Sequence, residues 1–568
     1  MKKVIAVLLL ATAALNAGAQ GWQDAYSFSE NNYVGTARSV GMGNAMTALG
    51  GDLGSLTFNP AGSAVAAYSQ FILTPAISLA ITGAQGDPDT GGFGDAQNAV
   101  YTRFKMPNFG FTLNMDTNNN HGLKRISMGF VGNATNDYTR QMRAAGSNDH
   151  SSIAAALATE ATGWRESEMT GGWFQDGAMP SWRSMTSYYG GIIDPLTSIE
   201  GAYMGVTETL LDNGDIQMTD PVYQQYGRRQ RGNKYDLLMN LALNFSDSFY
   251  VGANIGITTL TYRNDEYWIE APDNTQIPFP VDYGGGNTGN LDNLRLRYSY
   301  RANGSGVYLK TGFIWRPFAG LRLGAAIQTP TLMEIRERYG YDASSVVNGV
   351  SRARTARESE EGEWSYMLRS PMRVNAGLAY SFGKVAVLSA DYEFVNQGRC
   401  RFKTVYFEDN YDFGSTNQDI ANNLGASHTF RVGAEVKPAS NLAFRLGYNY
   451  ITGAEKGLVD ANGNKFTPVR HQGSVGFGYS SGGSFFADFA VRASFIPDEY
   501  LRPYSYYCWY YGLKNDGNEY KTANILNAGV DTKDIAWADQ DIDNEVLTPR
   551  VIVRPLLFDV IATVGWRF

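Results

Sequence analysis

Cysteine and histidine are scarce in this chain, whose 568 residues include two Cys and four His. These side chains supply most protein metal sites and all disulfide frameworks, so little remains for either. A basic excess is missing as well, because 47 Lys and Arg stand against 55 Asp and Glu, which gives a net charge of −8. Proteins that bind nucleic acid are usually basic. No metal, no cofactor and no nucleic-acid partner is therefore expected.

Long hydrophobic runs are also lacking. Beyond the N-terminus no apolar stretch reaches the ~18 residues that a transmembrane helix needs, which excludes a helical membrane protein. Charged residues make up only 18% of the chain, below the ~25% that is usual in soluble globular proteins. Tyrosine (35 residues) and glycine (63 residues) are abundant instead. This composition favours an all-β chain whose strands carry one apolar face.

The first residues have the pattern of an export signal. Two lysines precede an apolar stretch over residues 4–15, and Ala17-Gly18-Ala19 supplies the small residues of a cleavage site. This pattern predicts a secretory signal peptide over residues 1–19. The apolar stretch is too short to span a bilayer, and no cysteine follows the cleavage site, which argues against a lipoprotein. The mature chain is expected to lie outside the cytoplasm.

From residue 69 onward, apolar and polar residues alternate. In the last segment, one face holds Leu556, Phe558, Val560, Ala562, Val564, Trp566 and Phe568. A period of two is typical of a strand with one apolar face. Fourteen segments show it: residues 69–81, 105–115, 125–133, 235–245, 248–262, 295–316, 320–330, 370–382, 384–396, 428–437, 441–452, 469–480, 484–495 and 556–568. Most have the length that a tilted membrane strand requires.

The connections between these segments are alternately short and long. The short ones include Ser246-Asp247 and Gly383, and the long ones are residues 134–234, 263–294, 331–369, 397–427, 453–468 and 496–555. Outer-membrane barrels have this asymmetry, with short periplasmic turns and long external loops. The sequence therefore predicts an all-β fold, a 14-stranded antiparallel transmembrane β-barrel over residues 69–568. A large secreted β-protein is the alternative.

The charged residues of the strands support the barrel. They share the parity of the small and polar positions: Arg373, Asp391, Glu393, Arg431, Glu435, Arg445, Arg470, Asp488, Arg492 and Asp559. A charge that faces lipid at the bilayer midplane costs about 2–4 kcal/mol. These residues are therefore expected to face the lumen, while the opposite parity faces lipid. The terminal Phe568 fits the aromatic last residue that is common in such barrels.

Residues 20–68 precede the first strand and show no sustained alternation. A fourteen-stranded barrel is too wide for its wall side chains to fill, so this segment is predicted to form a hatch inside the lumen. Asn59 before Pro60 is held in an extended conformation and starts a turn, and its amide is suited to satisfy backbone groups of a packed hatch. An ordinary surface turn is the alternative.

These residues resemble a known family. Residues 37–45, which include Gly41, Gly43 and Asn44, followed by Asp52 and by Asn59-Pro60-Ala61-Gly62, resemble the hatch of FadL-type outer-membrane transporters of long-chain fatty acids and other hydrophobic compounds. The resemblance implies fourteen strands, an N-terminal hatch with an Asn-Pro-Ala motif, and passive uptake in the outer membrane of a Gram-negative cell envelope. The loop over residues 134–234 is longer than that family's, which leaves the ligand open.

In that family the ligand leaves sideways through a gap in the barrel wall. Two candidate gaps stand in this sequence. Pro75, inside the first strand, has no N–H to donate. Around Gly304 and Gly306 the apolar parity of the sixth strand switches, which indicates a β-bulge. The alternative is that the upper half of that strand stands clear of the bilayer, where lipid imposes no parity.

Aromatic residues in the long loops are candidates for ligand capture. They are Trp164, Trp173 and Phe174 in the first very long loop, and Tyr507 and Trp509 in the last. The alternative is that they belong to an interfacial aromatic girdle and to ordinary loop packing. Cys400 and Cys508 both fall in or near external loops, and whether they pair is left open.

The sequence thus predicts a monomeric, passive transporter of hydrophobic small molecules in the outer membrane, and no enzyme. A surface binding or adhesion protein that uses the long loops is the second reading. An outer-membrane lipid hydrolase is a lesser alternative, since Ser427 adjoins His428 but neighbours in a strand point to opposite faces. A haem receptor would need a pair of histidines that the sequence does not suggest.

Overall fold

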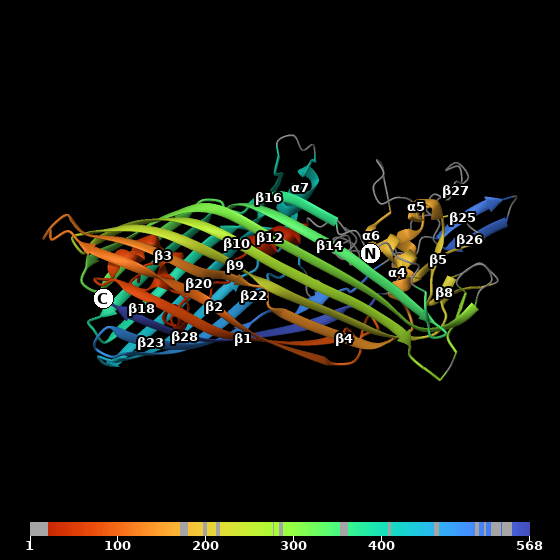
Figure 1. Cartoon of the computed structure of the whole chain (residues 1–568), viewed down its shortest axis with the longest axis horizontal. Coiled ribbons are helices and arrows are strands. Elements are labelled where there is room, and N and C mark those ends of the chain that lie inside the picture. Colours follow the sequence, from red (N-terminus) through yellow and green to blue (C-terminus); the bar gives the residue numbers. More distant parts are fainter. Residues whose placement is uncertain are drawn as a thin grey trace.

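The computed structural model describes residues 21–170, 180–196, 201–211, 216–276, 278–282, 288–352, 362–406, 411–458, 465–505, 510–515, 518–523, 535–536 and 548–568. The predicted signal peptide, residues 1–19, lies outside these ranges. Most of the described chain is antiparallel strand wrapped into one long barrel (Figure 1). Among the described residues, no helix is long and apolar enough to cross a membrane.

Fourteen strand positions form the wall. The first seven are β1 (Gln70–Gly86), β2 (Gln97–Asp116), β3 (Leu123–Asp137), β9 (Val222–Phe245), β10 (Phe249–Pro272), β12 (Thr288–Phe318) and β13 (Leu321–Gln328). The others are β17 (Arg373–Phe382), β18 (Ala386–Asn396), β20 (Ala426–Ala439), β21 (Leu442–Thr452), β22 (Val469–Ser480), β23 (Phe485–Phe495) and β28 (Val551–Arg567). β28 pairs back onto β1, from Gln70↔Arg567 to Gly86↔Val551, and closes the cylinder. The predicted fourteen-stranded barrel is confirmed.

At five places in the wall, a short break separates one strand from a second strand that continues it. The second strands are β4 (Arg140–Asn148), β14 (Leu332–Val347), β16 (Gly362–Arg369), β19 (Arg401–Thr404) and β24 (Glu499–Leu501). Together with the upper parts of β9, β10 and β12, they occupy ends of the segments that were predicted as loops: residues 134–234, 263–294, 331–369, 397–427 and 496–555. The strands therefore reach further from the bilayer than the alternation indicated.

The upper part of β12 shows why the alternation failed to reveal these strands. Nearer the bilayer Val307 and Leu309 are exposed on the outer face, whereas higher up Leu296 is fully buried on the inner face and Arg297 is exposed. The pairing with β10 and with β14 keeps one register across Gly304 and Gly306. There is no β-bulge, so the candidate wall gap at these two glycines is wrong. The parity switch marks the level at which water replaces lipid.

The outer face carries a continuous apolar belt. Exposed side chains on it include Phe71, Ile77, Phe104, Phe111, Leu241, Ile255, Leu309, Leu378, Leu388, Val432, Leu446, Val475, Phe489 and Val560. A surface this apolar and this extended is not stable in water, whereas a closed antiparallel barrel with such a belt is the build of an outer-membrane protein. Nine of the ten charged residues assigned to the lumen are buried, and the tenth, Arg470, is half-buried beside Glu30 of the hatch.

The hatch lies inside the cylinder, as predicted. It contains the helices α2 (Trp22–Ser29) and α3 (Ala37–Gly41) and the 3-10 turns η1 (Leu53–Thr57) and η2 (Pro60–Val65). Residues 39–50 are all buried. Figure 1 shows red segments of the hatch within the wall and marks the C-terminus at the end of the barrel that holds the tight turns.

The opposite end of the barrel is closed by a cap, which we define as the described residues between 149 and 221. It holds α4 (Ile153–Ala161), α5 (Glu166–Thr170) and α6 (Trp182–Tyr189), with short strands β5 (Ile193–Pro195), β6 (Tyr203–Gly205), β7 (Glu208–Leu210) and β8 (Ile216–Met218). Apolar residues such as Leu157 and Ile192 pack on Tyr226, Trp268 and Leu294 of the upper wall. The remaining described elements are β11 (Pro280–Asp282), β15 (Val350–Ser351), η3 (Gln397–Arg399), α7 (Gly414–Asn423), β25 (Tyr510–Asn515), β26 (Asn518–Ala523) and β27 (Ile535–Ala536).

Candidate functional site

Asn59 ties the hatch to the wall. Its Nδ2 donates to the carbonyl oxygen of Thr47 at 2.8 Å, within the hatch, and to that of Phe313 at 2.9 Å, on β12. Its Oδ1 accepts from the N–H of Ala61 at 3.1 Å and caps η2. The backbone of Asn59 is extended, as the following Pro60 requires. One buried amide therefore fixes both the turn and its attachment to the barrel.

We expect Asn59→Ala to lower the free energy of unfolding by about 3 kcal/mol, because it removes a cap and leaves two buried carbonyls without donors. Thermal unfolding in detergent, followed by loss of the folded band in gels, measures this. The matched control is Asn119→Ala, since exposed Asn119 makes one bond, to the carbonyl of Leu123. Equal stability of the two variants would contradict the role of Asn59.

The other hatch-motif residues bring backbone close to backbone. Gly43 has a positive φ of 61°, and a Cβ there would stand 2.8 Å from the carbonyl oxygen of Val432 on β20. A Cβ on Gly41 would lie 3.3 Å from the Cα of Gly476 on β22. Asn44 also adopts a positive φ, and its Nδ2 donates to the carbonyl of Tyr33 at 3.1 Å. The small residues of the motif thus let the hatch contact the wall directly.

Buried ion pairs add a second kind of attachment. Glu435 on β20 accepts from Arg38 of α3 at 3.1 Å and from Arg445 of β21 at 2.7 Å. Arg445 also pairs with Asp488 of β23 at 2.6 Å. Each charge in this group has an opposite partner, which buried charges require. The lumen-facing charges therefore bind the wall strands to each other and to the hatch.

Between β2 and β3 the described part of the wall loses its strand pairing. The ladder between β2 and β3 ends at Asn108↔Asn133. Above it, residues 97–105 of β2 stay paired with β1, while β3 and β4 stay paired with β9. Between the two sides the described residues show only one isolated bridge, Asp95↔Ala145. We call the unpaired stretch of β2 and the facing residues 134–139 the wall break.

At the wall break, β3 pairs with the hatch in place of β2. The N–H of Val34 donates to the carbonyl oxygen of Ala134 at 3.2 Å, and the N–H of Asn32 donates to that of Thr135 at 2.7 Å. A little higher, the hydroxyl of Tyr138 donates to the carbonyl of Ser27 in α2 at 3.1 Å. The strand therefore bends inward, away from its neighbour in the wall.

Polar side chains cross the wall break in this conformation. Lys105 of β2 pairs with Asp137 of β3 at 2.8 Å and with Asp559 of β28 at 2.9 Å. Arg103 donates to the hydroxyl of Thr139 at 3.2 Å and to the carbonyl of Gly232 at 2.8 Å. The break is thus bridged by long cationic side chains, which can change rotamer without breaking the ladders on either side.

An apolar cluster fills the lumen between the hatch and the cap. We call it the lumenal cluster: Ala25, Phe28, Leu260, Tyr262, Tyr300, Ala302, Met333, Ile335, Tyr366, Leu368, Cys400, Phe402, Phe413, Ile420 and Leu424. Tyr262 contacts Phe28 of α2 edge-on, with ring centroids 5.5 Å apart, and Tyr138 at 5.1 Å. The cluster is therefore continuous with the wall break through Tyr138.

Helix α2 occupies the base of this cluster. The cavity beneath Phe28, lined also by Lys234, Met333 and Arg373, measures only about 20 Å³, roughly the space of one water molecule. Lys234 is buried there, and its Nζ donates to the carbonyl oxygens of Phe28 and Glu30. A larger ligand enters this space only when α2 moves.

No family model and no curated protein matches this chain. Solved structures do. One is a Pseudomonas aeruginosa FadL homologue, at 14% identity over 94% of this chain and 98% of that chain, with a TM-score of 0.47. The chain is similar to FadL-type channels over nearly its whole length. The P. putida toluene transporter TodX (11% identity, 95% and 99% covered, TM-score 0.43) and the CymD monoaromatic hydrocarbon channel (12%, 93% and 97%, 0.42) are similar as well.

The structure describes only some of the residues that were predicted to capture a ligand. Trp164 packs, partly buried, against the apolar core of the cap, while Trp173, Phe174, Tyr507 and Trp509 lie outside the described residues, as does Cys508. Cys400 is buried, with its Sγ 3.3 Å from the hydroxyl of Ser29. Capture by the loop aromatics therefore stays a prediction.

Pro75 on β1 was the other candidate gap in the wall. The pairing of β1 with β2 shifts by one residue between Thr74 and Ala76, yet β1 keeps one register with β28 on its other side. The wall is therefore not open at Pro75. The signal that sequence reasoning missed is Pro107, which lies in β2 where the ladder with β3 stops, and which has no N–H to donate.

The two histidines considered for catalysis face outward, whereas Ser427 has the opposite parity. His428 on β20 lies 2.8 Å from the Tyr392 hydroxyl, and His471 on β22 lies 2.7 Å from that of Tyr448. Ser427 bonds instead to the carbonyl of Thr452. Within the described ranges, no three His, Cys, Asp or Glu side chains gather as metal ligands would.

Glu208 gives the cap a pH dependence. Burial raises the pKa of its carboxyl to about 7, opposed by the hydrogen bond from the N–H of Gly205 and reinforced by nearby Glu270. The folded cap therefore holds a proton that the unfolded chain releases above its ordinary value near 4.5, so stability falls as pH rises from there to about 7. We expect Glu208→Gln to flatten this fall. Limited proteolysis of the cap at pH 5.5 and 8 measures it, and an unchanged slope would contradict the assignment.

Proposed function

We propose that this chain is a FadL-type outer-membrane channel for the passive uptake of hydrophobic compounds, long-chain fatty acids among them. The observation that carries this proposal is the wall break beside the hatch, which opens next to an apolar cluster. A water-filled pore does not help an apolar solute, because hydrating it costs about 25 cal/mol per Å². A side exit lets such a molecule pass from the lumenal cluster into the bilayer without crossing water.

The proposed route follows the contacts of the closed state. A ligand settles among the aromatic and aliphatic side chains of the lumenal cluster and displaces Phe28 with helix α2. Because Tyr138 bonds to α2, this displacement frees the bend of β3. Arg103 and Lys105 then swing aside, and the wall break admits the ligand to the membrane. No step of this route requires a catalytic group, so the chain is not proposed to be an enzyme.

The base of the lumenal cluster favours an anionic amphiphile over a neutral hydrocarbon. Lys234 has a buried amine whose bonds are to two backbone carbonyls of the hatch, and Arg373 lies in the same lining. When α2 moves, those carbonyls leave and a carboxylate can replace them, with a stronger, charge-assisted bond. The solved structures named for toluene and monoaromatic hydrocarbons make a neutral aromatic ligand the natural comparison.

Uptake in cells with and without the protein tests the proposal. We expect faster uptake of radiolabelled oleate when the protein is present, and Lys234→Met is expected to weaken oleate binding to the purified protein while toluene binding stays unchanged. Equal uptake in both strains would contradict transport and would support the alternative of a surface-binding or adhesion protein. If Lys234→Met weakens the binding of oleate and of toluene equally, the proposed role of Lys234 is contradicted.

A further inference from the structure

Four arginines form a row on the outer face of the upper wall. Arg231 on β9 is paired with Arg263 on β10, Arg263 with Arg301 on β12, and Arg301 with Arg338 on β14. Their sequence neighbours Tyr262, Ala302 and Glu337 are buried on the inner face, and Arg263, Arg301 and Arg338 are exposed. The four side chains therefore stand side by side outside the barrel. We call them the arginine row.

Such a row is unfavourable by itself. Like charges directly opposite one another destabilise a sheet, and here three successive strand pairs repeat the same juxtaposition. The two outer members are partly neutralised, since Arg231 pairs with Asp265 at 2.5 Å and Arg338 pairs with Glu363 at 2.9 Å. Among the described residues, no carboxylate lies within ion-pair distance of Arg263 or Arg301. The two central arginines therefore lack a counter-ion from the described part of the chain.

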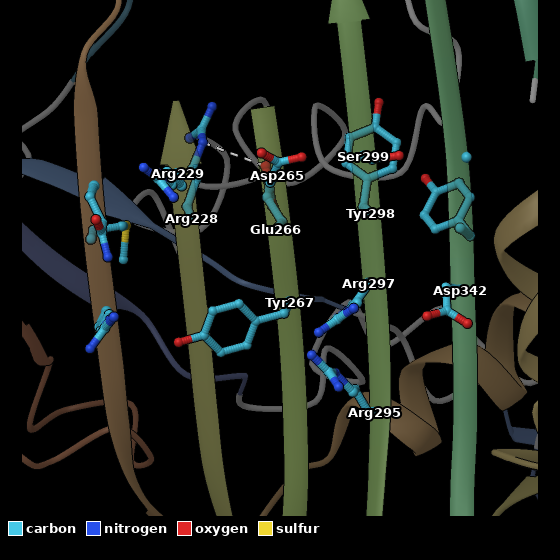
Figure 2. Close-up of a pocket in the computed structure, with 15 residues that line it drawn as sticks. Arg228, Arg229, Asp265, Glu266, Tyr267, Arg295, Arg297, Tyr298, Ser299 and Asp342 are labelled. Atoms are coloured by element: carbon cyan, nitrogen blue, oxygen red, sulfur yellow. Dashed lines mark ion pairs between the residues drawn. The ribbon is translucent and has the colours of Figure 1, made fainter. Parts of the chain in front are cut away.

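A pocket adjoins the row on its side away from the membrane. It measures about 590 Å³, and most of its lining comes from positions with the same outward parity as the row, including Arg143, Arg229, Tyr267 and Arg297. Three acidic residues, Asp265, Glu266 and Asp342, also line it, against five arginines. Figure 2 shows Arg229, Tyr267 and Arg297 on three neighbouring strands, with Arg295 and Asp342 close by. A concave, cationic surface with an aromatic ring suits a phosphorylated sugar.

The height of the row above the lipid belt identifies the neighbour. Ile257 on β10 and Val307 on β12 are the last aliphatic residues on the outward faces below the row, and Arg263 and Arg301 stand six residues above them. Six residues of a tilted strand rise about 14 Å. This is the level of lipid head groups and attached sugars in the outer leaflet, so the row faces head groups and not acyl chains.

We propose that the arginine row and its pocket bind the phosphorylated head group of an outer-leaflet glycolipid. Guanidinium groups bind phosphate in bidentate fashion and keep their charge in every physiological condition. A phosphate between Arg263 and Arg301 neutralises the repulsion along the row, and the attached sugars fit the pocket beside Tyr267. The site lies on the outer face, so it is separate from the transport route, and it holds even if the transported ligand differs from the one proposed.

Thermal unfolding of the purified protein with added rough-type lipopolysaccharide tests this site. We expect a saturable stabilisation of the wild type, and a roughly thirtyfold weaker apparent affinity in Arg263→Gln/Arg301→Gln, because each arginine near an anionic lipid surface contributes about a fivefold step. Chemically dephosphorylated lipopolysaccharide is expected to bind the wild type as weakly as the intact lipid binds the variant.

The matched control removes the same charge from the opposite rim. Lys384→Gln/Lys437→Gln alters two exposed residues beside the tight turns, and it is expected to leave the affinity unchanged. Equal affinity of wild type and Arg263→Gln/Arg301→Gln would overturn the proposal, as would equal binding of the dephosphorylated lipid. If this variant loses affinity for oleate but keeps its affinity for lipopolysaccharide, the proposal is also overturned, and the row is assigned to the transported ligand. Unchanged oleate uptake in the variant is expected.

Discussion

Cells that carry Val34→Cys/Ala134→Cys are expected to lose at least nine-tenths of oleate uptake when oxidised, and to recover it on reduction. These residues form the antiparallel bridge between the hatch and the bend of β3. Partners of this kind have Cα atoms about 4.5–5.5 Å apart, which suits a disulfide. The bond would hold the hatch against β3, and the wall break could not open for a ligand. Uptake of labelled oleate, measured before and after a reductant, checks this.

The control for this lock is a disulfide within the wall. Leu388→Cys/Ala434→Cys joins β18 to β20, which stay paired in any open state, and it is expected to leave uptake unaltered by oxidation. Both pairs are to be made in a background with Cys400→Ser and Cys508→Ser, so that no native thiol competes. Full uptake with the hatch disulfide formed would show that the ligand passes without movement at Val34.

Asp559→Asn is expected to lower the free energy of unfolding by about 3–5 kcal/mol, because it leaves buried Arg492 without its counter-ion and removes one of the two carboxylates that pair with Lys105. Asp559 is fully buried and accepts from Arg492 at 2.7 Å and from Lys105 at 2.9 Å. It joins the last strand to β23, and it holds the lysine that crosses the wall break. Loss of thermal stability in detergent is the measurement.

The exposed pair Arg125–Asp116 provides the comparison for Asp559. Asp116 keeps 59% of its side-chain surface exposed, and exposed pairs contribute about 0–1 kcal/mol. Asp116→Asn is therefore expected to change stability little, with a clear difference from Asp559→Asn. If the two variants unfold at the same temperature, the cluster at Asp559 does not stabilise the closing strands.

The membrane-spanning part of the fold was predictable because the bilayer restricts the residue types on both faces of each strand. Outward positions must be apolar and inward positions may be charged, so segments such as 441–452 and 484–495 carry an alternation that matches β21 and β23 within a residue or two. The hatch was predictable for a different reason. A wide cylinder needs filling, and an Asn-Pro-Ala turn with small residues before it is suited to pack on backbone.

Above the bilayer the same rule no longer applies. Water contacts the outer face there, and the cap supplies apolar partners on the inner face. An apolar residue such as Leu296 therefore points inward and a charged residue such as Arg297 points outward, the reverse of the arrangement lower on the strand. A prediction that expects apolar residues on the outer face therefore assigns this stretch to a loop. The wall break was missed because it depends on the absence of pairing between two strands, which no single segment encodes. Pro107 is its one local trace, and Lys105–Asp137 joins residues too far apart in sequence to be matched.

The unequal length of the wall strands shapes how a solute meets this protein. β12 has 31 residues, while β21 has 11. At about 3.3 Å per residue and the usual tilt, one side of the rim overhangs the other by roughly 45 Å. α7 contributes Phe413 and Ile420 to the apolar interior. The wall is thus much taller on one side than on the other, and under the proposed function we expect hydrophobic compounds to approach the interior from the low side.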